Sequence, residues 1–162
     1  MKKSTKKTGK KAGKKTKTVA KKSVRKKSAK RASPLEANKA LVLRCYTEWW
    51  DANGDVGTVD EMVSPDYIGH RDDGTTRNRE GLKQKMIDYQ TNIGGLYEKV
   101  LDVIAEGDKV MVRYSMHGRH TGVVNGVAPT GKPIDYEGVE IFRVVKGKIV
   151  EFWHFGPPVK LG

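Results

Sequence analysis

The sequence has little that would suit a membrane or an oxidising compartment. Cys45 is the only cysteine among 162 residues, so no disulfide can form within the chain. No apolar run approaches the roughly 18 residues that a membrane-spanning helix needs. The first 33 residues also lack the apolar core of a secretory signal. We therefore expect a cytoplasmic protein.

Acidic residues are absent from the first 33 positions, and this absence divides the chain in two. Of the 32 Lys and Arg residues, 16 lie in residues 1–33, whereas all 19 acidic residues lie in residues 34–162. The formal charges are therefore +16 for the first segment and 16 − 19 = −3 for the second. Repeated lysine pairs and few apolar residues predict a disordered lysine-rich tail over 1–33. The change in composition at Ser33 and Pro34 predicts one domain over 34–162.

The tail is a candidate polyanion-binding segment, because each phosphate that a lysine contacts releases condensed counterions. Its composition resembles the arms of linker histones and bacterial histone-like proteins. Lysines that could contact phosphates are spread along it: Lys2, Lys6, Lys10, Lys14, Lys21 and Lys26. Two interpretations stay open. The tail could bind nucleic acid non-specifically and associate the protein with the nucleoid, or it could only solubilise or anchor the domain.

Apolar residues spaced by three and four predict helices in the first half of the domain. The first is expected from Leu35 to Asn53, and the glycine that follows is a typical signal for the end of a helix. A short helix is expected over 56–63, and a brief strand over 67–70. Asn78 is the expected N-cap of a third helix over 79–92.

After Gly95 the apolar period changes to two, which is typical of strands. Strands are expected over 96–105, 109–120, 134–144 and 148–155. Helices followed by antiparallel strands indicate the α+β class, with the helices packed on one face of a curved sheet.

Three segments of the second half carry a family resemblance: GRHTG at 118–122, GVAPTGK at 126–132, and VEIFRV at 139–144 with GKIVE at 147–151. In these segments the chain resembles the SnoaL-like polyketide cyclases or ester cyclases of the nuclear transport factor 2-like superfamily. The resemblance covers roughly residues 36–155. It implies a cone-shaped curved antiparallel sheet with three N-terminal helices packed on its concave face.

The resemblance also implies an activity. Family members close a ring when a substrate carbanion attacks a carbonyl group, and they use acid/base catalysis without a metal or cofactor. A small apolar carbonyl or ester compound is the expected substrate. In the polyketide cyclases an Asp on the last strand is the acid/base and a His lies on the preceding strand. Here His154 stands at the position of that Asp, and Glu140 stands at the position of that His. A carboxylate and an imidazole are therefore both present, but each lies on the strand where the family has the other.

The turn before the last strand decides whether these two side chains meet. A three-residue loop over 145–147, with Gly147 in the left-handed region, would place Glu140 opposite Phe152 and Gly138 opposite His154. Glu140 and His154 would then be diagonal neighbours on one face, roughly 7–8 Å apart. A two-residue loop would put them on opposite faces.

This register assigns the other apolar residues to the two faces of the sheet. The face of the Glu–His pair would also carry Tyr136, Phe142, Val144, Val150 and Phe152. Of these, Tyr136, Phe142 and Phe152 are expected to line the substrate pocket. Burial there raises the pKa of a carboxyl group and an imidazolium lowers it, so the pair could move a proton near neutral pH. An internal salt bridge is the alternative. The opposite face would carry Val139, Ile141, Ile149 and Trp153, and its apolar character predicts a homodimer.

Three further residues are candidates for the substrate pocket. His120 has the strand parity of inward residues, although it could equally be a hydrogen-bonded structural histidine. Trp49 could line the pocket or only pack in the core, and His70 is expected at its mouth. The nearby acids of residues 72 and 73 are too weak a signal to predict a metal site. The competing function is a non-catalytic small-ligand-binding or scaffold domain that the basic tail tethers to nucleic acid.

Overall fold

The structure is a computed structural model that describes residues 9, 33–71 and 73–156. Apart from residues 9 and 33, the predicted disordered tail, with its six candidate lysines, lies outside the described residues. Asp72, named above with the weak metal signal, lies outside them as well. No helix within the described ranges is long and apolar enough to cross a membrane.

The first helix, α1 (Pro34–Glu48), begins where the sequence predicts and ends earlier. The side-chain oxygen of Ser33 accepts a hydrogen bond from the backbone N–H of Glu36 at 3.3 Å. This satisfies one of the donors left free at a helix start. The helix ends at Glu48 instead of continuing to residue 53, because the chain turns there: the Asp51 carboxylate accepts a hydrogen bond from the N–H of Asn53 at 2.7 Å.

The other helices confirm the pattern-based prediction. A 3₁₀ turn, η1 (Val56–Thr58), leads into the single-turn helix α2 (Val59–Met62). The third helix, α3 (Arg79–Asn92), starts behind Asn78, whose side-chain oxygen accepts a hydrogen bond from the N–H of Gly81 at 2.9 Å.

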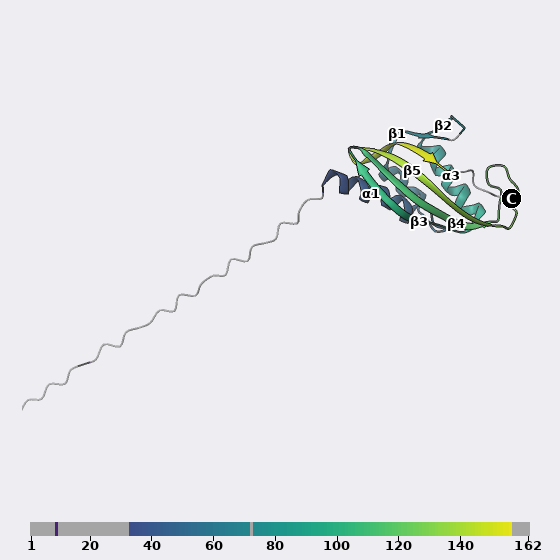
Figure 1. Ribbon diagram of the computed structural model, residues 1–162, viewed down its shortest axis with the longest axis horizontal. Coiled ribbons are helices and arrows are strands. Elements are labelled where there is room, and N and C mark those ends of the chain that lie inside the picture. Colours follow the sequence, from purple (N-terminus) through teal and green to yellow (C-terminus); the bar gives the residue numbers. More distant parts are fainter. Residues whose placement is uncertain (1–8, 10–32, 72, 157–162) are drawn as a thin grey trace, which may run out of the picture. The chain divides into compact units, whose positions relative to one another are not determined.

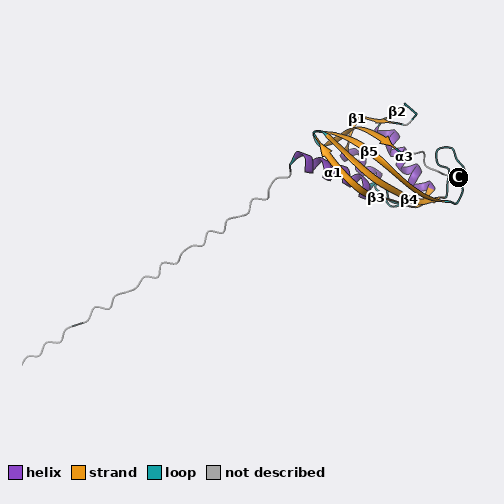
Figure 2. Cartoon of the chain, in the orientation of Figure 1, coloured by secondary structure: helices purple, strands orange, loops and turns teal. Residues whose placement is uncertain are grey.

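Six strands form one sheet in the order β2-β1-β6-β5-β4-β3 (Figure 1). Their bounds are β1 Val63–His70, β2 Thr76–Arg77, β3 Ile93–Glu106, β4 Lys109–His120, β5 Pro133–Val145 and β6 Lys148–Phe155. The α+β class and the helices on one side of the sheet are confirmed, and Figure 2 shows the purple helices against one side of the orange strands. The sheet is mixed, because β1 runs parallel to β6 while the other neighbours are antiparallel.

The β5–β6 hairpin corrects the predicted register. Val145 pairs with Lys148, so the turn has two residues, Lys146 and Gly147, with φ of 51° and 73°. A β-bulge follows, since Arg143 pairs with Glu151 while the next residue, Val144, pairs with Ile149. The bulge adds one extra residue to β6. A two-residue turn alone would have put the later residues of β6 on the opposite face of the sheet, and the extra residue returns them to the expected face.

The bulge also changes which residues face the helices. Ile149 is buried with an exposed fraction of 1%, whereas the expectation placed it on the outer face. Val150, expected on the inner face, is the extra residue of the bulge. On β5 the residues at even positions from 134 to 144 are all buried, which confirms the predicted strand parity.

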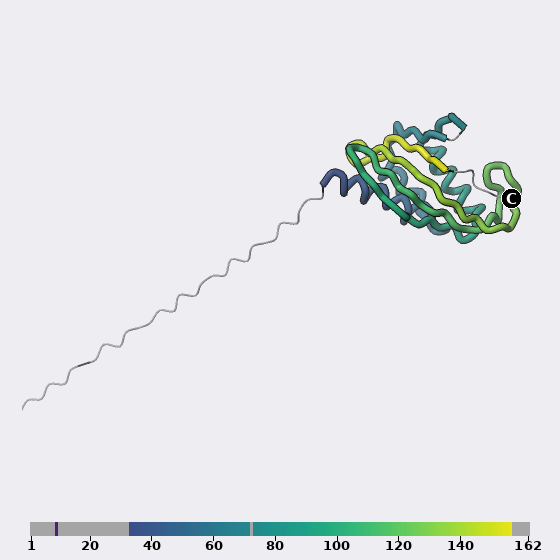
Figure 3. Tube along the Cα trace, in the orientation of Figure 1, coloured from purple at the N-terminus to yellow at the C-terminus, as the bar shows by residue number. Residues whose placement is uncertain are grey.

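The long connection between β4 and β5 extends beyond the end of these strands (Figure 3). Its start is held to the end of α3, because the backbone N–H groups of Thr121 and Gly122 both donate to the carbonyl oxygen of Asn92, at 3.0 and 2.9 Å. His120 holds the other end of the connection by a hydrogen bond, because the backbone N–H of Thr130 donates to His120 Nδ1 at 3.3 Å.

Candidate functional site

An inner pocket lies between the helices and the inner face of the sheet. Its lining combines aromatic and aliphatic side chains with a few ionisable ones: Trp49, Trp50, Val63, Tyr67, Gly69, His70, Arg71, Arg77, Leu82, Lys85, Glu140, Phe142, Ile149 and Phe152. About 460 Å³ of this region is free of protein atoms, counting the part open to solvent. Only about 20 Å³ admits the centre of a water molecule, so the pocket is narrow.

Glu140 is the acidic residue of this lining, and it is almost completely buried, with an exposed fraction of 3%. The hydroxyl group of Tyr46, on α1, donates a short hydrogen bond to its carboxylate. Burial raises the pKa of Glu140 to about 7, against the lowering effects of the Tyr46 hydrogen bond and the charge of Lys85. Glu140 can therefore gain or lose a proton at neutral pH.

His154 lies directly opposite Glu140 on the neighbouring strand. The structure thus replaces the expected diagonal pair by a closer one, since directly opposite Cβ atoms are roughly 4.5–5.5 Å apart. The Nε2 atom of His154 is 2.6 Å from the hydroxyl oxygen of Tyr136. Gly138 makes room for this ring, because a Cβ atom at that position would stand 3.1 Å from Nε2.

A second inward carboxylate, that of the partly buried Glu98 on β3, was not identified from the sequence. Its Oε2 atom is buried and has no hydrogen-bond partner in the part of the chain that the structure describes. Burial, followed by the charge of Glu140, raises the pKa of Glu98 well above its ordinary value, and Lys85 opposes this shift. The signal was present in the sequence, because Glu98 has the strand parity of the buried Leu96.

Two other participants could not be found by pattern. Tyr46 occupies one of the apolar positions of α1, and nothing in the sequence pairs it with a strand residue 94 positions later. Lys85, on α3, holds its amino group 5.2 Å from the ring centroid of Trp50 and 5.1 Å from that of Tyr89. Such cation–π contacts depend on tertiary packing.

Four of the expected pocket residues line the inner pocket: Trp49, His70, Phe142 and Phe152. His70 is the last residue of β1, and its Nε2 atom is 2.9 Å from Glu151 Oε1. Its ring stacks on that of Trp153 at 5.0 Å between centroids.

The other two expected pocket residues, Tyr136 and His120, are not part of this lining, and neither is the catalytic candidate His154. His154 and Tyr136 form the neighbouring pair described above. His120 is fully buried and holds the connection between β4 and β5. Its geometry therefore matches the structural alternative given for it.

The arrangement suits the storage and transfer of a proton. Glu140 and Glu98 interact electrostatically inside the fold, so their protons leave in coupled steps. Desolvation favours their neutral forms, whereas the hydrogen bond from Tyr46 and the charge of Lys85 favour ionised Glu140. A carboxyl group balanced in this way can act as an acid or as a base near pH 7.

Comparisons with known proteins agree with this fold. The family model described as SnoaL-like polyketide cyclase matches residues 40–159. The structure is also similar to a candidate SnoaL-like polyketide cyclase from Jannaschia sp. CCS1, with a TM-score of 0.70 and 25% sequence identity. That match covers 78% of this chain and 90% of the other. A search of curated proteins found no match.

Two Streptomyces proteins give further matches. AclR from Streptomyces galilaeus, named as a candidate hydroxylase, has a TM-score of 0.67 and 27% identity, covering 76% of each chain. IdmH from Streptomyces antibioticus, named as a candidate polyketide cyclase, has a TM-score of 0.62 and 28% identity, covering 73% of this chain and 90% of the other. The differing names show that one fold carries more than one assigned chemistry.

Proposed function

The chain belongs to the SnoaL-like polyketide cyclase family, and on that premise we propose that it is an ester cyclase type enzyme working by acid/base catalysis. The substrate class is a small apolar carbonyl or ester compound with an acidic C–H group between two carbonyls. Glu140 and His154 are the proposed proton-transfer residues.

One observation carries the proposal: Glu140 is a buried carboxyl group in a mostly apolar pocket, with a pKa of about 7. A residue held near neutrality is suited to take a proton from carbon and to release it again. The aromatic and aliphatic part of the lining also matches an apolar substrate, because transfer of apolar surface out of water is favourable there.

The proposed step conserves atoms and charge. Ionised Glu140 takes the proton from the carbon between the carbonyls, and the resulting carbanion attacks a carbonyl carbon of the same molecule. A carbon–carbon bond forms, and the carbonyl oxygen receives a proton from protonated His154. Transfer of the proton from Glu140 to His154, its cross-strand neighbour, restores both groups.

Deuterium exchange tests the first step without knowledge of the natural substrate. Methyl benzoylacetate in D₂O at pH 7 loses the NMR signal of its methylene protons as carbon-bound hydrogen exchanges. We expect the protein to accelerate this loss and Glu140→Gln to reduce the acceleration by roughly 10²- to 10⁴-fold, the usual contribution of a general base. His154→Asn should slow ring closure or product release more than exchange.

Glu106→Gln is the matched control, because this side chain is exposed at the far end of β3. It should keep the wild-type exchange rate. Equal exchange rates for wild type and Glu140→Gln, with both proteins folded by circular dichroism, would exclude Glu140 as the base.

A further inference from the structure

Two basic residues, Arg77 and Lys85, belong to the lining of two neighbouring cavities. One is the inner pocket with Glu140. The other is an outer cleft between α3 and the connection that follows β4, where about 260 Å³ admits the centre of a water molecule. Its lining is Arg77, Gly81, Gln84, Lys85, Asp88, Tyr89, Val123, Val124 and Asn125. Both side chains therefore form part of the wall of each cavity.

Arg77 differs from the other arginines that the structure describes. Each of those forms an ion pair or donates a hydrogen bond: Arg44, Arg71, Arg79, Arg113, Arg119 and Arg143. Arg77 has neither among the described residues, although it is half-buried and burial lowers its pKa. A partly desolvated guanidinium without an anion is unfavourable.

The stem of Arg77 packs against a neighbouring helix, which argues against a side chain that merely extends into solvent. A Cβ atom at Gly81 would stand only 2.8 Å from Arg77 Cγ, so the stem lies directly against the first turn of α3. The guanidinium keeps five donors in a planar fork, a shape that matches both oxygens of a carboxylate.

Lys85 adds a second positive charge without an ion-pair partner in the described domain. Its amino group lies near the rings of Trp50 and Tyr89, and its charge reaches the buried Glu98 and Glu140. The acidic residue of the outer cleft, Asp88, accepts a hydrogen bond from Gln84 at 2.9 Å. The cleft therefore has more positive than negative charge available to a ligand.

We propose that Arg77 and Lys85 bind a carboxylate on the substrate, which holds that end of the molecule in the outer cleft and directs its carbonyl end toward Glu140. The substrate class is thus narrowed to apolar carbonyl compounds that carry a carboxylate. This inference rests on the proposed function, because it concerns the substrate of the same pocket. Arg77 is a binding residue here and takes no part in proton transfer.

A binding experiment tests the proposal without turnover. Isothermal titration calorimetry of the full chain compares 2-naphthoate with 2-naphthamide, which has the same shape without the charge. We expect the carboxylate to bind roughly tenfold or more tightly than the amide. Arg77→Gln and Lys85→Gln should each reduce this preference while leaving affinity for the amide within about twofold of wild type.

Arg79→Gln is the matched control, because Arg79 forms ion pairs with Asp60 and Glu80 and lines neither cavity. It should keep the full preference. Since the lysine-rich tail could bind naphthoate weakly, the same titration with six tail lysines replaced by Gln should give an unchanged preference.

Equal affinity for the two ligands, absence of binding by both, or a preference that survives Arg77→Gln would overturn the proposal. Failure of the proposed function looks different. If naphthoate is preferred and Arg77→Gln removes that preference, the carboxylate site is supported. If Glu140→Gln at the same time leaves deuterium exchange unchanged, the catalytic role of Glu140 is excluded.

Discussion

Glu140 is buried in the core of the domain, so its ionisation lowers the free energy of unfolding. The size of this effect depends on pH. The pKa of Glu140 is raised from 4.5 to about 7 by burial. A group whose pKa is higher in the folded than in the unfolded chain stabilises the fold below its unfolded pKa, and that stability is lost as pH rises through the folded value. The loss amounts to about 3 kcal/mol for a shift of this size.

We therefore predict that the free energy of unfolding of the wild-type protein falls between pH 4.5 and pH 8. Glu140→Gln should show a smaller fall, because an amide does not ionise. Urea unfolding at pH 5, 6, 7 and 8 measures the difference. Carboxylates whose pKa is lowered, such as Asp60, Asp73 and Glu151, titrate below this range and do not obscure it.

Glu98 provides a second variant for the same measurement. Because burial and then the charge of Glu140 raise the pKa of Glu98, Glu98→Gln should also reduce the fall, and the double variant should remove most of it. Glu106→Gln should leave the curve unchanged, because that side chain is exposed. Parallel wild-type and Glu140→Gln curves would mean that the Glu140 carboxyl group titrates at its ordinary pKa.

The sequence indicated part of this residue-level arrangement. Strand parity placed Glu140 inside, and the hairpin between β5 and β6 brought His154 near it, because both are local properties. The contacts of Tyr46 and Lys85 depend on how α1 and α3 pack on the sheet, and sequence spacing contains no information about that packing. Glu98 was overlooked although its parity was visible.

At the scale of elements, turns were harder to predict than helices and strands. The bounds of α3, β4 and β6 agree with the periodic patterns, since periodicity and capping are local. The pairing register of the β5–β6 hairpin could not be predicted without knowing both its turn length and its bulge. Glu140 and His154 nevertheless share a face as expected, because the bulge in β6 offsets the change from a three-residue to a two-residue turn.

This turn allows a stability prediction. Lys146 adopts a φ of 51°, a left-handed conformation that asparagine tolerates better than lysine. We expect Lys146→Asn to stabilise the protein by about 0.5 kcal/mol, seen as a rise in melting temperature of about 2 °C. Gly147→Ala, at a φ of 73°, should lower the melting temperature instead. A fall with Lys146→Asn would show that the asparagine is not accommodated in this turn.

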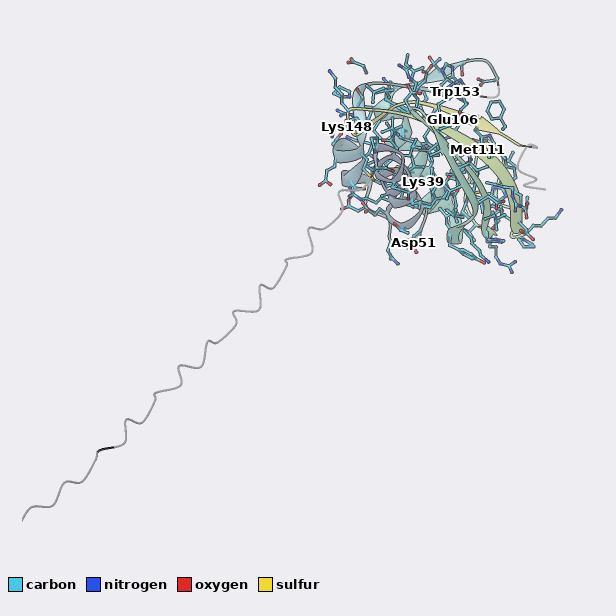
Figure 4. The ribbon with its side chains drawn as sticks, turned by 60° about the vertical axis from the view of Figure 1, so that its left-hand side comes forward. Lys39, Asp51, Glu106, Met111, Lys148 and Trp153 are labelled. Carbon is cyan, nitrogen blue, oxygen red and sulfur yellow. The ribbon has the colours of Figure 1, made fainter. Side chains whose placement is uncertain are left out.

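At the scale of the whole molecule, the outer face of the sheet has a partly exposed apolar row. It crosses four paired strands through Ile104, Met111, Ile141 and Trp153. Figure 4 labels Met111 and Trp153, which flank Ile141. Ile104 has an exposed fraction of 59%, and this row is where we expect the predicted homodimer to form.

Ile104→Lys tests that expectation, since a charge within an apolar interface opposes association. Sedimentation equilibrium should show a dimer for the wild-type protein and a monomer for the variant. Ile87→Lys is the control, because Ile87 is exposed on α3 at 45% and lies away from the sheet. A wild-type monomer, or a variant that remains dimeric, would contradict the prediction.

The lysine-rich segment gives the last prediction, which concerns charge alone. The remaining residues carry a formal charge of −3, so any affinity for nucleic acid should come from residues 1–33. If about five phosphates are contacted on duplex DNA, affinity should fall by roughly 10²- to 10³-fold between 50 and 200 mM salt. Replacing Lys2, Lys6, Lys10, Lys14, Lys21 and Lys26 with Gln should weaken binding and flatten the salt dependence, as measured by fluorescence anisotropy. An unchanged slope would place the DNA contacts in the domain, whereas undetectable binding by the wild type at 50 mM salt would favour a solubilising or anchoring role.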